Sequence, residues 1–158
     1  MRTFITLILA ALVCIMPLAA QTQARALGAD ISWCTEMEAD GMQFYNTDGQ
    51  PTDIFVLLRQ IGMNAVRLRV WANPEQRYGA WSDRADVLAK ARRAKAAGLD
   101  VLLAFHYSDY FADPGKQTKP QTWATLPFDD LKAAMVAHTV DMLQALRNDG
   151  IEPRWVQI

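Results

Sequence analysis

Two stretches of the chain share one pattern, in which a glycine releases a helical segment into a short hydrophobic strand. Residues 64–71 follow Gly62, residues 101–106 follow Gly98, and each run ends in polar or aromatic side chains. Strands that alternate with helices are typical of parallel sheets, because each parallel pairing requires a crossover connection. The pattern predicts βα units whose functional groups lie at the carboxyl ends of the strands, as in an α/β barrel.

Other elements follow from the same periodicities. We expect short strands over 27–33 and 154–158, and helices over 51–61, 83–97 and 128–148. Proline near a first turn, Ser82 or Asp83 as N-cap, and glycine after each helix mark the helix ends. The last helix carries an apolar stripe that should face a core: Leu131, Met135, His138, Met142 and Leu146.

The connection from 107 to 127 shows little helical or strand periodicity. A stretch of this length inside a compact domain is usually functional or disordered. Its mixture of rings and charges favours function: Asp109, Tyr110, Phe111, Asp113, Lys116 and Trp123.

The length limits how much of a barrel is present. A (β/α)8 TIM barrel needs about 250 residues, whereas this chain has 158. We therefore expect an α/β fold comprising only about the first three and a half βα units of such a barrel, truncated inside its fourth strand.

Residues 1–26 have the features of a cleaved secretory signal peptide. A positive start precedes an apolar run over 4–16, and Ala20, Ala24 and Ala26 are alternative cleavage sites. A membrane anchor is less well supported, because this run is shorter than the roughly 20 residues that span a bilayer. We expect a secreted protein, extracellular or periplasmic, with no membrane association once the signal is removed.

Composition excludes several functions. A formal net charge of −1 offers no basic excess for nucleic acid. After the signal, Cys34 is the single cysteine, so we expect a small buried residue without a disulfide or metal role. Phosphate-binding loops, HExxH pairs and nucleophile elbows are absent from the sequence. No cofactor and no metal ligand is expected in this chain, while a structural metal in further loops stays open.

Arg67, Arg69 and Trp71 alternate along one predicted strand and should share a face. Two arginines inside a barrel are costly unless they meet carboxylates or a polar ligand. One interpretation is a structural ion-pair network. The other is an arginine that orients a catalytic carboxylate, and we favour Arg67 for that role.

Three further residues suit sugar recognition. His106 ends a predicted strand, so we expect it to contact substrate, whereas His138 lies on an apolar helix stripe and should be structural. Asp30 precedes Trp33 by three residues. A carboxylate accepts hydrogen bonds from sugar hydroxyls, and an indole packs against C–H faces. A turn or helix-cap role is the alternative for Asp30.

Several motifs together resemble glycoside hydrolase family 53, the arabinogalactan endo-β-1,4-galactanases. They occur in order and at compatible spacing over nearly all of the chain after the signal: GADISW at 28–33, RLRVWANP at 67–74, HYSD at 106–109, ADPGKQ at 112–117 and WVQI at 155–158. The resemblance implies that residues 27–158 are the N-terminal part of a TIM-barrel catalytic domain. It implies a retaining glycosidase acting on β-1,4-galactan, arabinogalactan or pectin side chains.

The resemblance also implies where catalysis occurs. Retaining enzymes use two carboxylates about 5 Å apart, which in this family are a glutamate directly after the fourth strand and one on the seventh. Both would lie beyond Ile158, so no catalytic residue is expected within this chain, and Glu36, Glu38, Glu75 and Glu152 match neither position. The implied substrate-binding residues are Asp30, Trp33, Arg67, Arg69, Trp71, His106, Asp109 and Asp113, the last two shaping the third loop.

Two departures from the family pattern affect only details. Ala104 replaces a usual aspartate, and Tyr110-Phe111 replaces a usual Thr-Trp. Two other functions stay open: a related barrel glycanase acting on mannan, xylan or a β-glucan, and a non-catalytic carbohydrate-binding half-barrel. The chain by itself is expected to be inactive.

Overall fold

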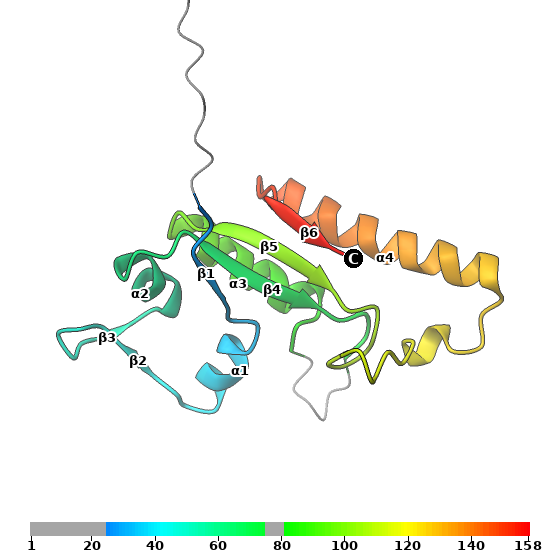
Figure 1. Ribbon diagram of the computed structural model, residues 1–158, viewed down its shortest axis with the longest axis horizontal. Helices are drawn as coiled ribbons and strands as arrows, with labels where there is room; N and C mark the ends of the chain where they lie inside the picture. The colour runs from blue at the N-terminus through cyan, green and yellow to red at the C-terminus, as the bar shows by residue number, and fades with distance from the viewer. Residues whose placement is uncertain (1–24, 75–80) are drawn as a thin grey trace, which may run out of the picture.

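The computed structural model describes residues 25–74 and 81–158. Its centre is a parallel sheet of four strands in the order β1-β4-β5-β6 (Figure 1), formed by Gly28–Asp30, Ala65–Val70, Asp100–Phe105 and Trp155–Gln157. The order of the strands in the sheet is the same as their order along the chain, so each successive βα unit extends the sheet in one direction. The predicted signal peptide, apart from its last two residues, lies outside the described residues.

Helices connect these strands. α1 (Cys34–Ala39) and α2 (Ile54–Gln60) follow β1, α3 (Arg84–Ala96) follows β4, and α4 (Phe128–Asn148) follows β5. The predicted long connection before α4 is present and contains one short 3-10 turn, Gln121–Trp123. Among the described residues, no helix is both long and apolar enough to cross a membrane.

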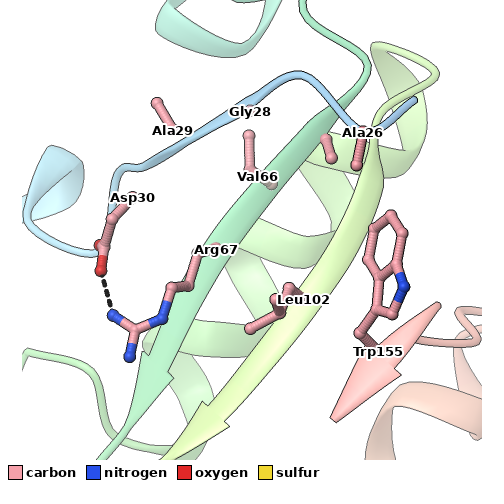
Figure 2. Close-up of a pocket in the computed structure, with 9 residues that line it drawn as sticks. Ala26, Gly28, Ala29, Asp30, Val66, Arg67, Leu102 and Trp155 are labelled. Carbon is pink, nitrogen blue, oxygen red and sulfur yellow. Dashed lines mark hydrogen bonds and ion pairs between the residues drawn. The ribbon is translucent and has the colours of Figure 1, made fainter. Parts of the chain in front are cut away.

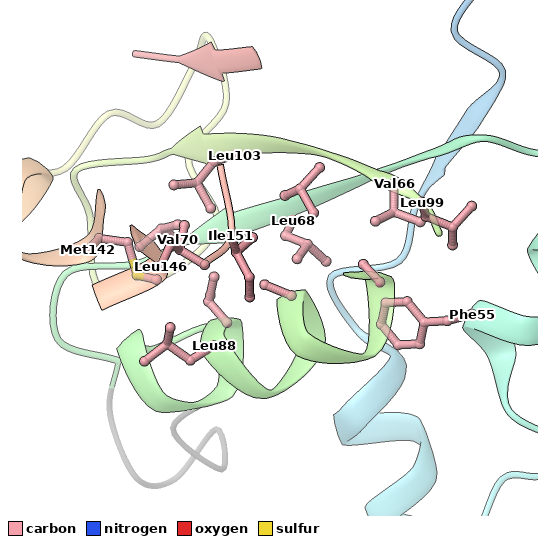
Figure 3. Close-up of a cluster of buried hydrophobic side chains, with 14 of the residues drawn as sticks. Phe55, Val66, Leu68, Val70, Leu88, Leu99, Leu103, Met142, Leu146 and Ile151 are labelled. Carbon is pink, nitrogen blue, oxygen red and sulfur yellow. The ribbon is translucent and has the colours of Figure 1, made fainter. Parts of the chain in front are cut away.

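The hydrophobic core lies between the sheet and the helices on one of its faces (Figure 3). In β4, Val66, Leu68 and Val70 are at most 1% exposed, and they pack in one cluster with side chains from α3 and α4. Alternation places Arg67 and Arg69 on the opposite face of the same strand. The sheet therefore separates an apolar, helix-covered side from a side that carries polar groups.

Two of the predicted helices are confirmed in detail. The Asp83 side chain caps α3 by accepting the Asp86 N–H at 2.8 Å, and α4 spans the predicted 128–148. Gly98 follows α3 with φ +70°, a left-handed conformation that glycine adopts without steric cost.

The prediction for 51–61 was partly wrong. Pro51 is not in the first helical turn, because Pro51–Thr52 (β3) pairs with Phe44–Tyr45 (β2) in a small antiparallel hairpin. The helix begins at Ile54 after Asp53, whose carboxylate accepts the Phe55 N–H at 2.7 Å. Sequence periodicity also missed α1 and this hairpin, and the first strand is shorter than predicted.

The apolar stripe of α4 is buried only toward its C-terminal end. Met142 and Leu146 are at most 1% exposed, but Met135 is 38% exposed, which corrects the prediction for that residue. His138 lies between these ends and packs edge-on against the rings of Phe105 and Trp123. His138 therefore contacts both the end of β5 and the connection that precedes α4.

Cys34 is confirmed as a buried residue. It is 2% exposed, and burial raises the pKa of its thiol to about 11. The thiolate that nucleophilic chemistry requires is therefore disfavoured.

Candidate functional site

Polar side chains meet where β1 ends beside the middle and second half of β4. Asp30 and Arg67 are register partners, and their side chains form an ion pair of 2.5 Å (Figure 2). The Nε of Arg69 lies 3.5 Å from the same carboxylate. Ser32 holds the other carboxylate oxygen of Asp30 through its backbone N–H at 3.0 Å and its hydroxyl at 2.6 Å. Asp30 thus makes the turn contact that was its alternative role, and it also joins Arg67 and Arg69 in the ion-pair network that was the structural interpretation of the arginines.

The charges of this cluster support one another. Burial would raise the pKa of the Asp30 carboxyl, but hydrogen bonds from Ser32 and Arg67 and the charge of Arg69 together lower it below its ordinary value. Burial lowers the pKa of Arg69, opposed by Asp30 and assisted by Arg67. Asp30 therefore stays ionised and is suited to fixing the direction of the Arg67 guanidinium.

Aromatic rings surround Arg69. Its guanidinium carbon lies 4.6 Å from the centre of the Trp33 ring and 5.1 Å from that of Phe111. Trp33 and Trp71 pack edge to face with ring centres 5.7 Å apart. Trp71 is buried, whereas Trp33 is 40% exposed and so retains ring surface for a ligand. The structure thus brings together Trp33, Arg69 and Trp71 from two strand ends.

His106 directly follows β5 and is oriented by the connection after it. Its Nδ1 accepts the Ala112 N–H at 3.1 Å. Burial, together with the positive charges of Arg69 and Arg67, lowers the pKa of this imidazole, with Asp30 opposing them. The neutral ring, with Nδ1 accepting, carries its proton on Nε2. His106 is therefore equipped to donate one hydrogen bond to an acceptor such as a sugar oxygen.

A cavity of about 580 Å³ lies beside these groups. Arg67, His106 and Asp113 are among its lining residues, and Gln157 is another, so β4, β5, β6 and the 107–127 connection all contribute to it. The Asp113 carboxylate accepts the Gly115 N–H at 2.7 Å, which shapes the loop at the cavity wall. The remaining lining is mixed in character: Phe105, Tyr107, Ala112, Pro114, Gln117, Lys119 and Ile158.

A second cavity, of about 360 Å³, lies over the strands on the face without helices (Figure 2). Asp30 and Arg67 border it, and the other lining residues are apolar, Leu102 and Trp155 among them. Layers of apolar side chains typically fill the interior of an α/β barrel. The apolar lining of this second cavity is typical of a barrel interior. The cavity of about 580 Å³, whose lining mixes polar and apolar side chains, is therefore the better candidate for a polar ligand.

Asp109 has a different environment from the other predicted site residues. It is 7% exposed, and its two carboxylate oxygens accept the backbone N–H groups of Asn73 at 3.0 Å and Gln121 at 2.8 Å. It is not among the residues that line the two cavities. Asp109 therefore ties the loop after β4 to the 3-10 turn and shapes the third loop, while its contact with substrate stays a prediction.

Sequence reasoning assigned no role to Gln157 or Ser32. The Gln157 side-chain oxygen accepts a hydrogen bond of 3.2 Å from Arg67, two strands away in the sheet. Ser32 is 1% exposed and bonds to Asp30. Gln157 could have been found from alternation, since it shares a face with Trp155 in the last strand. The contact of Ser32 has no comparable sequence signal.

Within 25–74 and 81–158, no three His, Cys, Asp or Glu side chains gather closely enough to hold a metal ion. The polar groups present are suited to hydrogen bonding and to orienting charge.

Parallel βα units with charged and aromatic groups at the carboxyl ends of the strands define this chain as part of an α/β-barrel protein of the enzyme type. The family model for Glycosyl hydrolase family 53 matches residues 26–158. The chain belongs to this family, which confirms the resemblance drawn from its motifs.

Curated relatives agree. The chain is 40% identical over 136 residues to Endo-beta-1,4-galactanase of Bacillus subtilis (strain 168), covering 83% of this chain and 32% of that protein. It is 40% identical over 131 residues to Arabinogalactan endo-beta-1,4-galactanase of Thermothelomyces thermophilus, covering 83% and 38%. The chain thus spans about a third of the length of the relatives it matches.

Solved structures confirm the fold. A fungal β-1,4-galactanase matches with a TM-score of 0.76 and 39% identity, over 82% of this chain and 38% of the other. A family 53 catalytic domain of Ignisphaera aggregans matches with a TM-score of 0.77 and 35% identity, over 83% and 38%. The predicted (β/α)8 TIM barrel, present in part, is confirmed.

Proposed function

We propose that the complete gene product containing this chain is a secreted, retaining glycosidase that cleaves internal β-1,4-galactosidic bonds of galactan and arabinogalactan, including those in pectin side chains. The observation that carries this proposal is the match to named galactanases over more than four fifths of the chain. The cavity beside Arg67, His106 and Asp113 supports a polar, uncharged ligand, because it combines hydrogen-bonding groups with rings.

In this proposal the chain supplies one side of the substrate site. Asp30 holds Arg67, and Arg67 in turn orients and keeps ionised the nucleophilic glutamate expected on the seventh strand. Trp33 offers ring surface to a sugar C–H face, and His106 donates a hydrogen bond to a sugar oxygen. Arg69 and Trp71 border the sugar site beside Trp33, and Asp109 and Asp113 shape the third loop around it.

Residues 1–158 alone are expected to be inactive. The three glutamates that the structure describes have other environments. Glu36 lies in the first turn of α1, Glu38 forms two hydrogen bonds with Arg93, of 2.6 and 2.8 Å, and Glu152 borders a cavity together with Lys95 and Gly98. Glu75 lies outside the described residues. Without a nucleophile and an acid/base, neither attack on the sugar nor protonation of the leaving group takes place.

The test is reducing-sugar release by the complete gene product from β-1,4-galactan, mannan, xylan and a β-glucan at equal mass. We expect the highest rate on β-1,4-galactan, and NMR of early products should show retained β configuration. A preference for another glycan, or an inverted anomer, would overturn the corresponding part of the proposal. Binding without cleavage would indicate a carbohydrate-binding barrel instead.

Secretion is a separate part of the proposal, based on the pattern of residues 1–26. The mature N-terminus, read by mass spectrometry from the culture medium or periplasm, should follow Ala20, Ala24 or Ala26. An intact N-terminus on cytoplasmic protein would overturn this part alone.

A further inference from the structure

Lys90 is a fully buried lysine on α3. Its side chain is 0% exposed, and its ammonium donates to the Ser32 carbonyl oxygen at 2.7 Å and to Asp86 Oδ2 at 2.6 Å. A buried charge is costly unless it is paired and hydrogen-bonded, and a pair of apolar residues is often at least as stable. The pair therefore calls for an explanation other than stability alone.

The Lys90–Asp86 pair joins two loops that leave the sheet at the same end. Through Ser32, Lys90 holds the turn after β1. Through Ser82, Asp86 holds the loop after β4, because Asp86 Oδ2 also accepts the Ser82 N–H at 2.6 Å. Ser82 has φ +63°, and its carbonyl accepts the N–H of Trp71 at 2.9 Å. One ion pair thus fixes a strained residue beside Trp71 and the turn beside Trp33.

The same pair connects to the charged cluster. The Ser32 hydroxyl donates to Asp30 at 2.6 Å and accepts the Arg69 N–H at 2.8 Å. Asp30 then pairs with Arg67 at the cavity. Lys90 lines neither the mixed cavity nor the apolar one, so its influence on a ligand passes through Ser32.

We propose that Lys90 is a positioning residue which, through Asp86 and Ser32, sets the Asp30–Arg67 ion pair and the Trp33–Trp71 ring pair in the geometry that receives substrate. The proposal rests on the proposed function, since it assumes that these two pairs border the sugar site, with Arg67 and the exposed ring of Trp33 facing the glycan. It assigns to a helix behind the sheet a role in catalysis without contact with the sugar.

The test separates positioning from stability. In the complete gene product, the double variant K90M/D86N removes both charges, so no unpaired charge stays buried, while the new amide oxygen still accepts the Ser82 N–H. The matched control is K95M. Lys95 is on the same helix and also donates to backbone carbonyls, those of Asp149 and Gly150 at 3.1 and 3.0 Å, but it is exposed and borders a cavity lined by other residues.

We expect K90M/D86N to keep a Tm within about 2 °C of the parent, roughly the shift that 1 kcal/mol produces in a protein longer than this chain. Its kcat/KM on β-1,4-galactan should fall about tenfold or more, since small misplacements of positioning groups cost that much. The acid limb of its kcat/KM pH profile should move up by about 0.5 pH unit or more, because a displaced arginine stabilises a carboxylate less. K95M should retain parental kinetics.

Parental kcat/KM and pH profile in a folded K90M/D86N would overturn the proposal. If this variant does not fold, K90Q/D86N replaces it, and the same criteria apply. It also leaves no unpaired buried charge, and its glutamine amide still donates a hydrogen bond but ends one bond short of Ser32. If the parent protein does not cleave galactan, the proposed function fails, and a crystal structure of the variant decides instead. An Asp30–Arg67 pair separated beyond about 4 Å, the limit of an ion pair, supports the role of Lys90; an unchanged pair refutes it.

Discussion

The two faces of β4 differ in chemistry: one is apolar and buried, and the other carries charged side chains. Val66, Leu68 and Val70 point toward α3 and α4 and are almost fully buried. Arg67 and Arg69, interleaved with them, share the carboxylate of Asp30. Five consecutive residues therefore supply both a core layer and a charged cluster, because strand alternation sends successive side chains to opposite faces.

One face of β4 therefore contributes to the stability of the fold, and the other carries the groups of the candidate site. The helix-covered face excludes water and stabilises the fold by apolar burial. The other face holds charges in fixed directions through hydrogen bonds. These ion pairs orient the side chains but add little to the free energy of unfolding. Substitutions on the two faces of one strand should consequently affect different measurements, all made on the complete gene product.

The largest effect is expected for Leu68→Ala. Leu68 is 0% exposed in the centre of the core, so the substitution leaves a cavity and should lower the free energy of unfolding by about 3 kcal/mol. Chemical denaturation measures this loss, while kcat/KM per folded molecule should stay near the parental value. Leu68→Met, which keeps the volume, should cost less than about 1.5 kcal/mol. Equal losses of unfolding free energy in both variants would mean that the cavity left by the smaller side chain is not the cause.

On the polar face, Arg67→Met should act in the opposite way. We expect kcat/KM on β-1,4-galactan to fall about 100-fold, or roughly 2.7 kcal/mol of transition-state stabilisation. The free energy of unfolding should change by less than about 1 kcal/mol, since the pair with Asp30 is partly exposed. Arg92→Met, which breaks the exposed pair with Asp149, is the control and should leave both quantities unchanged. A large loss of stability with normal kinetics in R67M would make Arg67 a structural residue.

Trp33→Ala should have a smaller effect, concentrated in KM. Trp33 offers exposed ring surface beside Arg69, and loss of one aromatic contact is worth about 1 kcal/mol. We expect KM for β-1,4-galactan oligomers to rise about fivefold to tenfold, with kcat within about twofold. Trp33→Phe, which retains a ring, should recover most of the affinity. An unchanged KM in the alanine variant would place the sugar elsewhere.

The smallest effect concerns the two histidines. Burial lowers the pKa of both, but only His106 also faces arginines. In Arg67→Met the pKa of His106 should therefore rise toward its ordinary 6.5, and that of His138 should not change. NMR titration of the ring protons measures both pKa values. Equal changes for His106 and His138 would contradict the claim that only His106 lies beside the arginines of β4.

The sign of the linked stability follows from these directions. A histidine with a lowered folded-state pKa binds fewer protons when folded, so its contribution to stability is fully present above 6.5 and is lost as pH falls through the interval below it. The free energy of unfolding of the parent should decline over this interval, and His106→Gln should make the decline shallower. An unchanged slope would refute the lowered pKa of His106.

Much of the fold was predictable because its signals are local. Apolar runs after Gly62 and Gly98 predicted β4 and β5, and the Asp83 cap with Gly98 predicted α3. The hairpin at 44–52 was missed because two-residue strands carry no periodicity. Pro51 was placed in a helix because proline is equally acceptable in a first helical turn and on an edge strand.

The candidate site was predictable as a set of residues, but not as a set of contacts. Alternation in β4 gave the shared face of Arg67 and Arg69, and the strand end gave His106. The contact between Lys90 and Ser32 joins residues 58 positions apart, and only the folded chain brings them together. Alanine-rich helices carry many solvent-facing lysines, so nothing in the sequence marks this one as buried.

The central claim is that the polar face of the strand ends receives β-1,4-galactan, and a crystal structure of the complete gene product with a bound β-1,4-linked galactose oligomer tests it most directly. The account predicts a sugar within hydrogen-bond distance of Arg67 or His106 and in contact with the Trp33 ring. An oligomer bound away from all three residues would contradict it.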